Sequence, residues 1–445
     1  SKDDHEFAQR LVETMRSDPE WFRQFLAMGL ARLADNPHAL QHARDTVLEF
    51  PKGDDRESVA AARYWEAMAV FAIARREAVT SNIDVTHLGS ETTKDRERAL
   101  LLELIETQRL TPALRAEVAD ALGSMGDPRF DDEKPHQWAK RIHDEANEPI
   151  PGFVRVPAGP FVMGMRRSAN VRRSNADIAA PFFIARTLTT VAQYAKFVDA
   201  GGYEMDEVLW SAQGIDWLFG RMDSKMANDH HQTWLAHRKL DLRNAPWDWS
   251  AQREHPSRPV TGVTWFEARA YARWLNAQMR PDIDVVPALK NYAVMLPTED
   301  QWERAARAKD LTSADARRWP WKGADESDVV QRANVDGSGI EHASAVGVFA
   351  PNPIGLFDMA GNAWEWMDNL YAESFETGFN RVEADRELLT YAEFDMCDLP
   401  SARGGSWTFP SDEASCSSRF RTPPVASSHV MGFRVALSLA SLSEA

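Results

Sequence analysis

The sequence predicts an all-α helical domain at residues 1–130, a linker at 131–150 and an α+β domain at 151–445. Three observations support this division. Apolar residues recur at helical spacing up to about Met125. After Pro151, short alternating or apolar runs are interrupted by glycine and proline, as in a domain of short strands and long loops. Between the two parts, residues Asp131 to His136 are polar and rich in turn formers, which is typical of a linker.

Length, charge and hydropathy limit the classes of partner. With 445 residues, 44% of them apolar, the chain has enough material for two or three hydrophobic cores. Its formal charge is -16, and it has no block of Lys and Arg that would follow a phosphate backbone, so we expect no nucleic-acid partner. No apolar run approaches about 18 residues, and the segment SKDDHEFAQRL is charged rather than a secretory leader. We expect a cytoplasmic protein with no membrane partner.

The first domain is predicted from its apolar stripes. Phe7, Leu11 and Met15 recur at i, i+4, and further helices are expected over about 58–78, 94–108 and 112–125. Two architectures remain open for this domain: a helical bundle or adaptor, and a fragment of an α-solenoid. No self-similarity at a fixed period is evident, which favours the bundle.

The second domain contains few helices. They are expected at Thr189–Ala200, Trp265–Met279 and Glu299–Ala308, each preceded by a threonine cap. At the third, Thr298 followed by Gln301 has the spacing of a capping box. Strands are expected over 153–159 and 161–165.

Eight motifs follow one another along this second domain. They are PAGPFVMG (157–164), TTVAQYAKF (189–197), RPVTGVTWFEARAYARWLN (258–276), LPTEDQWERAARA (296–308), RWPWKG (318–323), NPIGLFDMAGNAWEWMDN (352–369), RGGSW (403–407) and GFRVA (432–436). In this order they resemble the formylglycine-generating, sulfatase-modifying enzyme family. The resemblance runs from about Phe153 to Ala436 and implies a C-type-lectin-type fold, an α+β body with long loops.

Most of these motifs are interpreted as structural. Gly404 and Gly405 are expected to adopt backbone conformations closed to other residues, with Trp407 buried after them. Arg434 is expected to pair with a buried carboxylate such as Glu365.

The resemblance also implies calcium, which family members coordinate around the GNAWEW loop. Carried over residue by residue, the ligands are Asp358, Gly361, Ala363 and Glu365. Oxygen-only ligands from a loop suit this hard cation. The family's second calcium site uses an asparagine–aliphatic pair, here Asn334 and Val335. Ser338 replaces the aspartate that follows, so this site depends on Asp336.

At the catalytic positions the sequence departs from the family. Its enzymes oxidise a substrate cysteine with copper held by two cysteines, and a soft monovalent metal requires such thiolates. The corresponding positions here are Phe409 and Ala414 or a neighbour. Only Cys397 and Cys416 occur, which excludes a disulfide framework. We expect no copper, and we expect Cys416 to be a small buried residue.

Iron-dependent sulfoxide synthases of ergothioneine-type pathways, which join such a domain to a helical domain with a three-histidine site, are a second enzymatic comparison. The helical half here contains His5, His38, His42, His87, His136 and His143. His38 and His42 share a helix face but have no evident third partner, so no iron is expected. In the long Trp-rich insertion, His230, His231 and His237 are interpreted as surface residues.

The stretch from Thr408 to Val430 lies between RGGSW and GFR, at the exposed ligand face of this fold. Its small, polar and scattered aromatic residues show no core periodicity and suit recognition. It resembles the variable region of diversity-generating-retroelement proteins; the alternative is an ordinary loop of a degenerate family member. The predicted ligand-binding residues are Thr408, Phe409, Ser411, Asp412, Glu413, Ser415, Ser418, Phe420, Thr422, Val425, Ser427, Ser428 and His429.

Two functions remain open. The first, favoured by the absent cysteine pair, is a non-catalytic recognition protein with a protein ligand or partner and a helical domain that docks a partner or effector. The second is a metal-dependent oxidoreductase of the formylglycine-generating or sulfoxide-synthase type.

Overall fold

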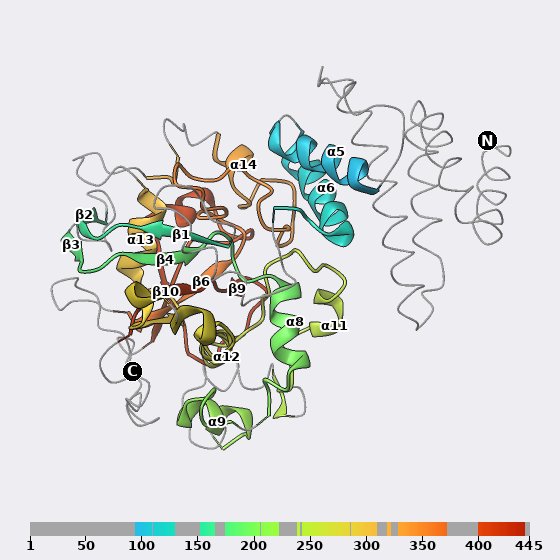
Figure 1. The fold of residues 1–445 in the computed structure, drawn as a ribbon. Coiled ribbons are helices and arrows are strands. Elements are labelled where there is room, and N and C mark those ends of the chain that lie inside the picture. Colours follow the sequence, from blue (N-terminus) through green and yellow to red (C-terminus); the bar gives the residue numbers. More distant parts are fainter. Residues whose placement is uncertain are drawn as a thin grey trace, which may run out of the picture. The chain divides into compact units, whose positions relative to one another are not determined.

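In the computed structural model the chain divides into two units, Ser1–Pro128 and Arg129–Ala445 (Figure 1). The structure describes residues 94–108, 110–129, 152–164, 174–204, 206–221, 238–240, 243–284, 286–308, 318–321, 328–371 and 399–440. The histidines considered above as metal ligands, Cys397 and the helix expected at 58–78 lie outside these residues. None of the described helices is long and apolar enough to cross a membrane.

Two helices of the first unit are described, α5 (Lys94–Glu106) and α6 (Pro112–Met125), and they pack against each other. The α6 helix begins as its sequence predicts, because the Thr111 hydroxyl accepts a hydrogen bond from the Leu114 N–H and Pro112 opens the first turn. Leu104 and Leu122 are fully buried. Both helices lie where the sequence predicts them; the all-α character of residues 1–93 stays a prediction.

The second unit mixes short strands with helices. Its helices are α8 (Val191–Asp199), α9 (Ala212–Leu218), α11 (Trp249–Gln252), α12 (Trp265–Asp284), α13 (Glu299–Arg307) and α14 (Val329–Arg332), with 3₁₀ turns at Pro287–Leu289 and Ser411–Ala414. Its strands are β1 (Phe153–Val156), β2 (Gly159–Met163), β3 (Ser174–Ile178), β4 (Phe182–Ala185), β5 (Tyr292–Met295), β6 (Trp364–Leu370), β7 (Pro400–Arg403), β8 (Arg419–Arg421), β9 (Met431–Gly432) and β10 (Ala436–Leu439).

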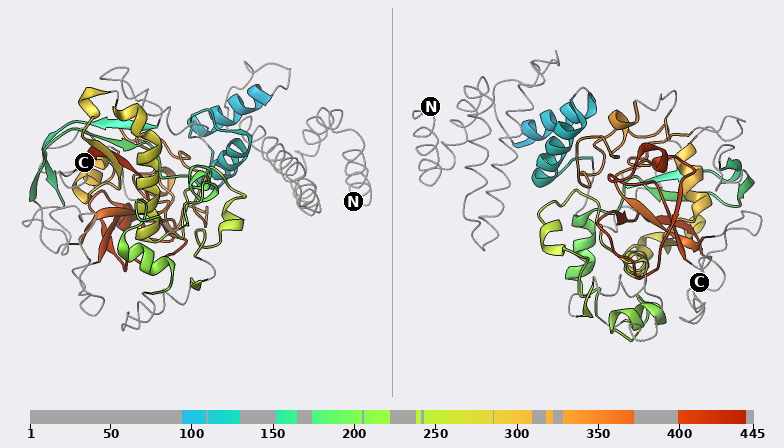
Figure 2. Two further views of the ribbon diagram at one scale, coloured as in Figure 1. Left: turned by 60° about the horizontal axis from the view of Figure 1, so that its bottom comes forward. Right: turned by 180° about the vertical axis from the view of Figure 1, so that it is seen from behind.

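Two four-stranded sheets bring distant segments together (Figures 1 and 2). In the first, the order is β1-β4-β10-β5 and all neighbours are antiparallel, so that Ala436 near the end of the chain pairs with both Ile184 and Met295. In the second, the order is β8-β7-β6-β9, and only the β6–β9 pair is parallel. The β2 and β3 strands form a separate two-stranded ladder.

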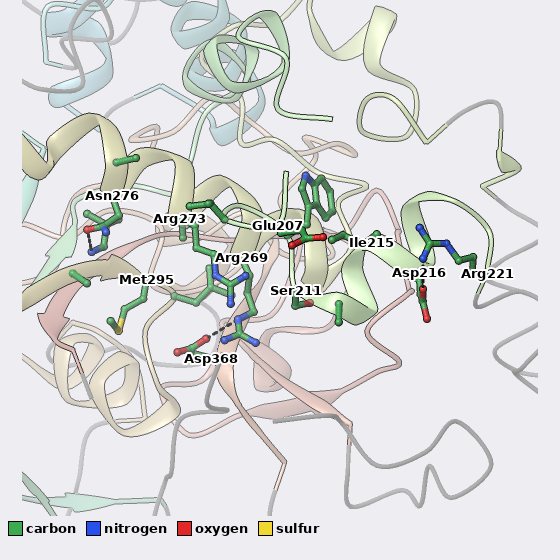
Figure 3. A pocket seen from close by; sticks show the side chains of 18 residues that line it. Glu207, Ser211, Ile215, Asp216, Arg221, Arg269, Arg273, Asn276, Met295 and Asp368 are labelled. Carbon is green, nitrogen blue, oxygen red and sulfur yellow. Dashed lines mark hydrogen bonds and ion pairs between the residues drawn. The ribbon is translucent and has the colours of Figure 1, made fainter. Parts of the chain in front are cut away.

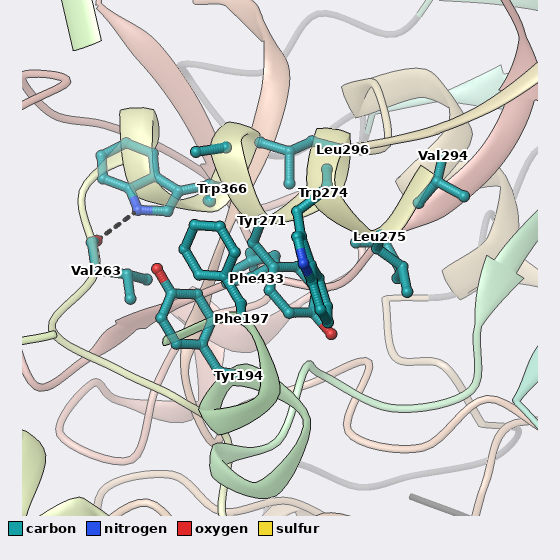
Figure 4. Packing of buried hydrophobic residues seen from close by; sticks show 14 of the residues in the cluster. Tyr194, Phe197, Val263, Tyr271, Trp274, Leu275, Val294, Leu296, Trp366 and Phe433 are labelled. Atoms are coloured by element: carbon teal, nitrogen blue, oxygen red, sulfur yellow. Dashed lines mark hydrogen bonds between the residues drawn. The ribbon is translucent and has the colours of Figure 1, made fainter. Parts of the chain in front are cut away.

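The main core is aromatic and lies between α8, α12 and the carboxy-terminal strands (Figure 4). Tyr271 stacks on Tyr194 with ring centroids 5.2 Å apart and meets Phe433 edge-on at 5.3 Å. Phe197 and Trp274 close the cluster, with centroids 5.8 Å apart. These rings fix the position of α12, which supports both the insertion and the loops discussed below.

The helix boundaries agree with the predicted caps, with one correction. Capping boxes are present at Thr190 with Gln193 and at Thr298 with Gln301. Helix α12, however, does not end at Met279 but continues to Asp284 through Pro281. Proline removes one backbone hydrogen bond, but Pro281 lies on the exposed side of the helix, where water can satisfy the carbonyl left over. On the opposite side Ile283 is fully buried, and its packing favours the extra turn.

The insertion between α8 and α12 is tied to the core by one buried carboxylate. Glu267 of α12 accepts hydrogen bonds from both terminal nitrogens of Arg238, at 2.7 and 2.9 Å, and from the Tyr203 hydroxyl at 2.5 Å. The same guanidinium lies over the ring of Trp217 in α9, 5.1 Å from its centroid. This contact chain holds α9 in a defined place beside α12.

Candidate ligand-binding surface

The loop from Gly404 to Val430 begins at a tight turn. Gly404 and Gly405 have φ of 101° and 77°, as their sequence context predicts. A Cβ on Gly405 would lie 2.7 Å from the Ala414 Cα, so the loop folds back closely onto its own 3₁₀ turn. Between these two points, Thr408, Pro410, Asp412 and Glu413 are exposed.

The structure sorts the predicted ligand-binding residues by exposure. Exposed are Thr408, Asp412, Glu413 and His429; half-buried are Phe409, Ser411, Ser418, Phe420 and Ser428; buried are Ser415, Thr422, Val425 and Ser427. Val425 belongs to the main core, and the Ser415 hydroxyl is engaged with that of Ser418 at 2.7 Å. The four buried positions present almost no surface to a ligand, so only the exposed and half-buried residues remain candidates for ligand contact.

Phe409 and Ala414, which the family resemblance places at or beside the positions of the copper-binding cysteines, are packed by apolar side chains. The Phe409 ring meets the buried Trp364 ring edge-on at 5.6 Å, and Phe420 stacks on the same tryptophan at 5.2 Å. Ala414 is fully buried against Gly405. Cys416 is fully buried in an apolar cluster, as predicted.

An aromatic cluster that the sequence analysis missed lies at the edge of this loop. The exposed His429 ring lies between two tryptophans, with centroids 6.2 Å from Trp247 and 5.5 Å from Trp407. Trp247 is 37% exposed, and Trp407 is half-buried rather than buried as predicted. The prediction for Trp407 was wrong because its ring packs on an exposed histidine instead of the core. We call Trp247, Trp407 and His429 the surface aromatic cluster.

Backbone contacts hold this cluster in place. The Trp247 N–H donates to the Gly262 carbonyl at 3.1 Å, and the Gln252 side chain donates to the Trp247 carbonyl at 2.7 Å. Gly262 has a φ of 66°, and a Cβ there would lie 2.9 Å from the Trp247 Cβ. The Gly262 N–H donates in turn to the Ser428 carbonyl at 2.9 Å, which joins the insertion to the 404–430 loop. The rings are thus preorganised on fixed backbone.

Acidic side chains flank the cluster in sequence. Asp412 and Glu413 are exposed on the 3₁₀ turn, and Asp248 is exposed next to Trp247. Partial burial and the neighbouring Asp412 carboxylate raise the pKa of Glu413. The exposed side chains of these segments therefore include carboxylates as well as aromatic rings.

The predicted calcium loop is closely packed. Gly361 lies against the second predicted pair, because a Cβ on it would be 2.2 Å from the Asn334 carbonyl oxygen. That oxygen accepts a hydrogen bond from the Asn362 N–H at 2.7 Å, and the Asn334 Oδ1 accepts one from the Ser338 hydroxyl at 3.1 Å. The Val335 carbonyl accepts from the Ser338 N–H at 3.0 Å. The oxygens of the second predicted site thus already serve as hydrogen-bond acceptors.

Glu365 is engaged as a structural carboxylate. Arg434 donates to it through Nε at 2.6 Å and Nη2 at 2.9 Å, which confirms the predicted pair. Burial raises the pKa of Glu365 even beside this guanidinium. Calcium at Glu365 would have to compete with Arg434, so the pair favours a structural role for this residue.

Asp358 is the remaining acid of the predicted calcium loop. Its Oδ2 accepts a hydrogen bond from the Gly347 N–H at 2.9 Å, and burial raises its pKa to about 6. The other two predicted ligands, Gly361 and Ala363, are buried and would contribute backbone carbonyls alone. Among the described residues there is no group of three or more His, Cys, Asp and Glu side chains placed to hold a metal.

Known proteins are similar to parts of this chain. Hercynine oxygenase from Mycolicibacterium smegmatis is 29% identical over 268 residues, which are 57% of this chain and 54% of that protein. Formylglycine-generating enzyme from Thermomonospora curvata is 27% identical over 268 residues, 54% of this chain and 76% of that protein. The chain thus spans about half the length of the hercynine oxygenase.

Two solved structures are similar to this chain at lower identity. PvdO from Pseudomonas aeruginosa is 21% identical, with 66% of this chain and 100% of that chain covered and a TM-score of 0.45. Treponema denticola variable protein 1 is 19% identical, with 65% and 95% covered and a TM-score of 0.42. The sulfatase-modifying factor enzyme 1-like domain matches residues 139–439. The chain therefore belongs to the sulfatase-modifying factor enzyme 1-like family, which its motifs resemble.

Proposed function

We propose that this chain is a non-catalytic recognition protein that binds a protein ligand through the 404–430 loop and the surface aromatic cluster. The observation that carries the proposal is the exposed His429 in ring contact with both Trp247 and Trp407, with the Trp247 segment joined to Ser428 through backbone hydrogen bonds of Gly262. Tryptophan supplies large contact area with little loss of side-chain entropy, and it is enriched among the residues that dominate binding energy.

The former catalytic positions support the same proposal. A copper oxidase of this family needs two thiolates, whereas Phe409 and Ala414 place apolar atoms there. The excess of acidic side chains, with a net charge of -16, argues against a nucleic-acid ligand. We further propose that residues 1–130 dock a partner or effector and that the 408–430 loop is of the variable, diversity-generating type. If the neighbouring DNA contains neither a reverse transcriptase nor a near-copy template repeat, the 408–430 loop is not of the diversity-generating type.

The binding proposal is tested with the full chain immobilised and exposed to lysate of its source organism. Proteins that are enriched on the wild type are purified and their affinity is measured directly. Trp247→Ala and Trp407→Ala are each expected to weaken binding about tenfold or more, because each removes a central aromatic contact. The matched control is Phe219→Ala, an aromatic residue 44% exposed at the end of α9, which should leave the affinity unchanged. Equal affinity of all three variants would refute the proposal.

A metal-dependent oxidoreductase is the second candidate, favoured by the names of the relatives. Such an enzyme would need a metal bound by residues other than the missing cysteine pair. Elemental analysis of the purified full chain for copper and iron separates the two candidates. Stoichiometric copper or iron that persists after dialysis would support the oxidoreductase.

We also propose structural calcium at the Asp358 loop, with Gly361 and Ala363 as carbonyl donors. Oxygen donors on an irregular loop suit Ca²⁺. A ligand that binds only the folded state raises the unfolding temperature as its concentration rises. Millimolar calcium should therefore stabilise the wild type and not Asp358→Asn. An unfolding temperature that is the same in calcium and in chelator would exclude the site.

A further inference from the structure

A cavity of about 770 Å³ lies between α9, α12 and β5, and none of the residues that line it belongs to the surface aromatic cluster (Figure 3). Small-molecule sites have volumes of roughly 300–1,000 Å³ and combine apolar walls with a few placed polar groups. Helix α12 forms one wall, the inserted helix α9 a second, and Ala293–Leu296 a third. Because Glu267 and Arg238 fix the insertion, α9 is held at this distance from α12.

One face of α12 directs hydrogen-bond donors into the cavity. Arg269, Arg273 and Asn276 follow one another at i, i+4 and i+7, so they share a stripe of the helix surface. Ala272 and Ala277 flank this stripe, and their small side chains leave room above the helix. Figure 3 shows the two arginine side chains reaching into the same part of the cavity.

Each of these polar groups is oriented by a specific contact. The Arg269 Nε lies 3.3 Å from the Asp368 carboxylate, and its guanidinium lies 4.5 Å from the centroid of the Trp265 ring. Arg273 donates to the Leu209 carbonyl at 3.3 Å. The Asn276 Oδ1 accepts from the Val294 N–H at 3.0 Å, which fixes its carboxamide with the NH₂ donors on the other side.

The remaining lining combines apolar side chains with carboxylates, two of which are in ion pairs. Val208, Ile215 and Met295 contribute apolar surface. Of the three carboxylates that line the cavity, Asp368 lies against Arg269 and Asp216 lies 3.4 Å from Arg221, while Glu207 is exposed. The positively charged donors on α12 and the apolar surface of Ile215 and Met295 favour a ligand with an anionic head and an apolar body.

We propose that this cavity binds a small amphipathic anion whose carboxylate or phosphate head contacts Arg273 and Asn276. Its apolar body packs against Ile215 and Met295. The guanidinium fork suits either oxyanion, and it offers no acceptor to a cationic head. This site is independent of the surface aromatic cluster and of the recognition proposed for it.

The probes are octanoate, octyl phosphate, octanol and octyltrimethylammonium, each titrated calorimetrically into the full chain. Saturable binding of octanoate or octyl phosphate is expected, and octanol and the cation should bind more weakly. The tighter of the two anions identifies the preferred head group. Arg273→Gln should weaken binding of the anion about tenfold, since a charge-assisted hydrogen bond is lost. The matched control is Arg280→Gln on the same helix, because Arg280 pairs with Asp284 at 2.8 Å and does not line the cavity.

A second variant tests the cavity itself. Ala277 is exposed on α12, so Ala277→Phe fills the space without entering the core and should abolish anion binding while the circular dichroism spectrum is unchanged. The proposal is overturned if no anion saturates at millimolar concentration, if the cation binds as tightly, or if Arg273→Gln and Arg280→Gln have equal affinities.

Discussion

Replacing Glu365 by glutamine tests the buried ion pair that holds the centre of the loop domain. Both Glu365 and Arg434 have side chains that are 0% exposed, and the substitution removes a charge but not shape. Loss of one partner from a buried pair costs about 3–5 kcal/mol, because the other charge stays buried without compensation. Arg434 keeps its hydrogen bonds to the carbonyls of Ala185 and Phe357, at 3.1 and 3.0 Å. We therefore expect the lower end, a loss of about 3 kcal/mol in the free energy of unfolding.

The assay is urea unfolding in chelator, followed by tryptophan fluorescence, because Trp364 and Trp366 flank the substituted residue. In the double variant Glu365→Gln with Arg434→Met the buried cation is gone as well, so part of the loss should be recovered relative to the single variant. Asp412→Asn, an exposed acid, is the control and should leave the unfolding curve unchanged. A single variant as stable as the wild type would refute the structural assignment of Glu365.

Three further predictions use the same unfolding assay. Glu267→Gln should destabilise the protein by about 3 kcal/mol, because Arg238 is left buried without its carboxylate; an unchanged curve would mean that this contact does not hold the insertion. Burial raises the pKa of Asp358 from 3.8 to about 6, so the folded state binds this proton more tightly than the unfolded state. Asp358 should therefore contribute up to about 3 kcal/mol more stability at pH 4 than at pH 7, and Asp358→Asn should remove that contribution; a variant whose stability depends on pH as the wild type's does would contradict it. Gly405→Ala should cost about 1–3 kcal/mol, because φ is 77° and the new Cβ would meet Ala414; full stability would show that the turn can relax.

Local features of the fold could be predicted from the sequence. The capping box of Thr298 and Gln301 lies within four residues, and both of its hydrogen bonds are present. The Arg434–Glu365 pair could be predicted because both residues stand in apolar motifs, where a buried charge requires a partner of opposite charge. The end of helix α12 could not be predicted from the sequence. Pro281 suggests that the helix ends before it, but the burial of Ile283 outweighs the cost of the proline.

The candidate site was predictable only in part, for a physical reason. The 408–430 loop follows from two flanking motifs, but its sequence does not show which side chains point outward. Thr422 and Ser427 are polar and nevertheless buried, and no spacing rule applies in an irregular loop. Trp247 joins His429 from a distant part of the chain, so only the fold brings them together. The sequence nevertheless contained a sign of the cluster, because Trp247 and Trp249 are closely spaced tryptophans. Gly262, later in the sequence, is a glycine that the close approach of Trp247 requires.

Peptide turnover tests recognition against oxidation most directly. The full chain is supplied with Cu(I), oxygen and a cysteine-containing peptide, and the peptide mass is followed, with the Thermomonospora curvata enzyme as the positive control. Because Phe409 and Ala414 provide no thiolates, the peptide cysteine should remain unmodified beyond the level given by copper alone. Conversion of cysteine to formylglycine with many turnovers per chain would contradict the proposed function.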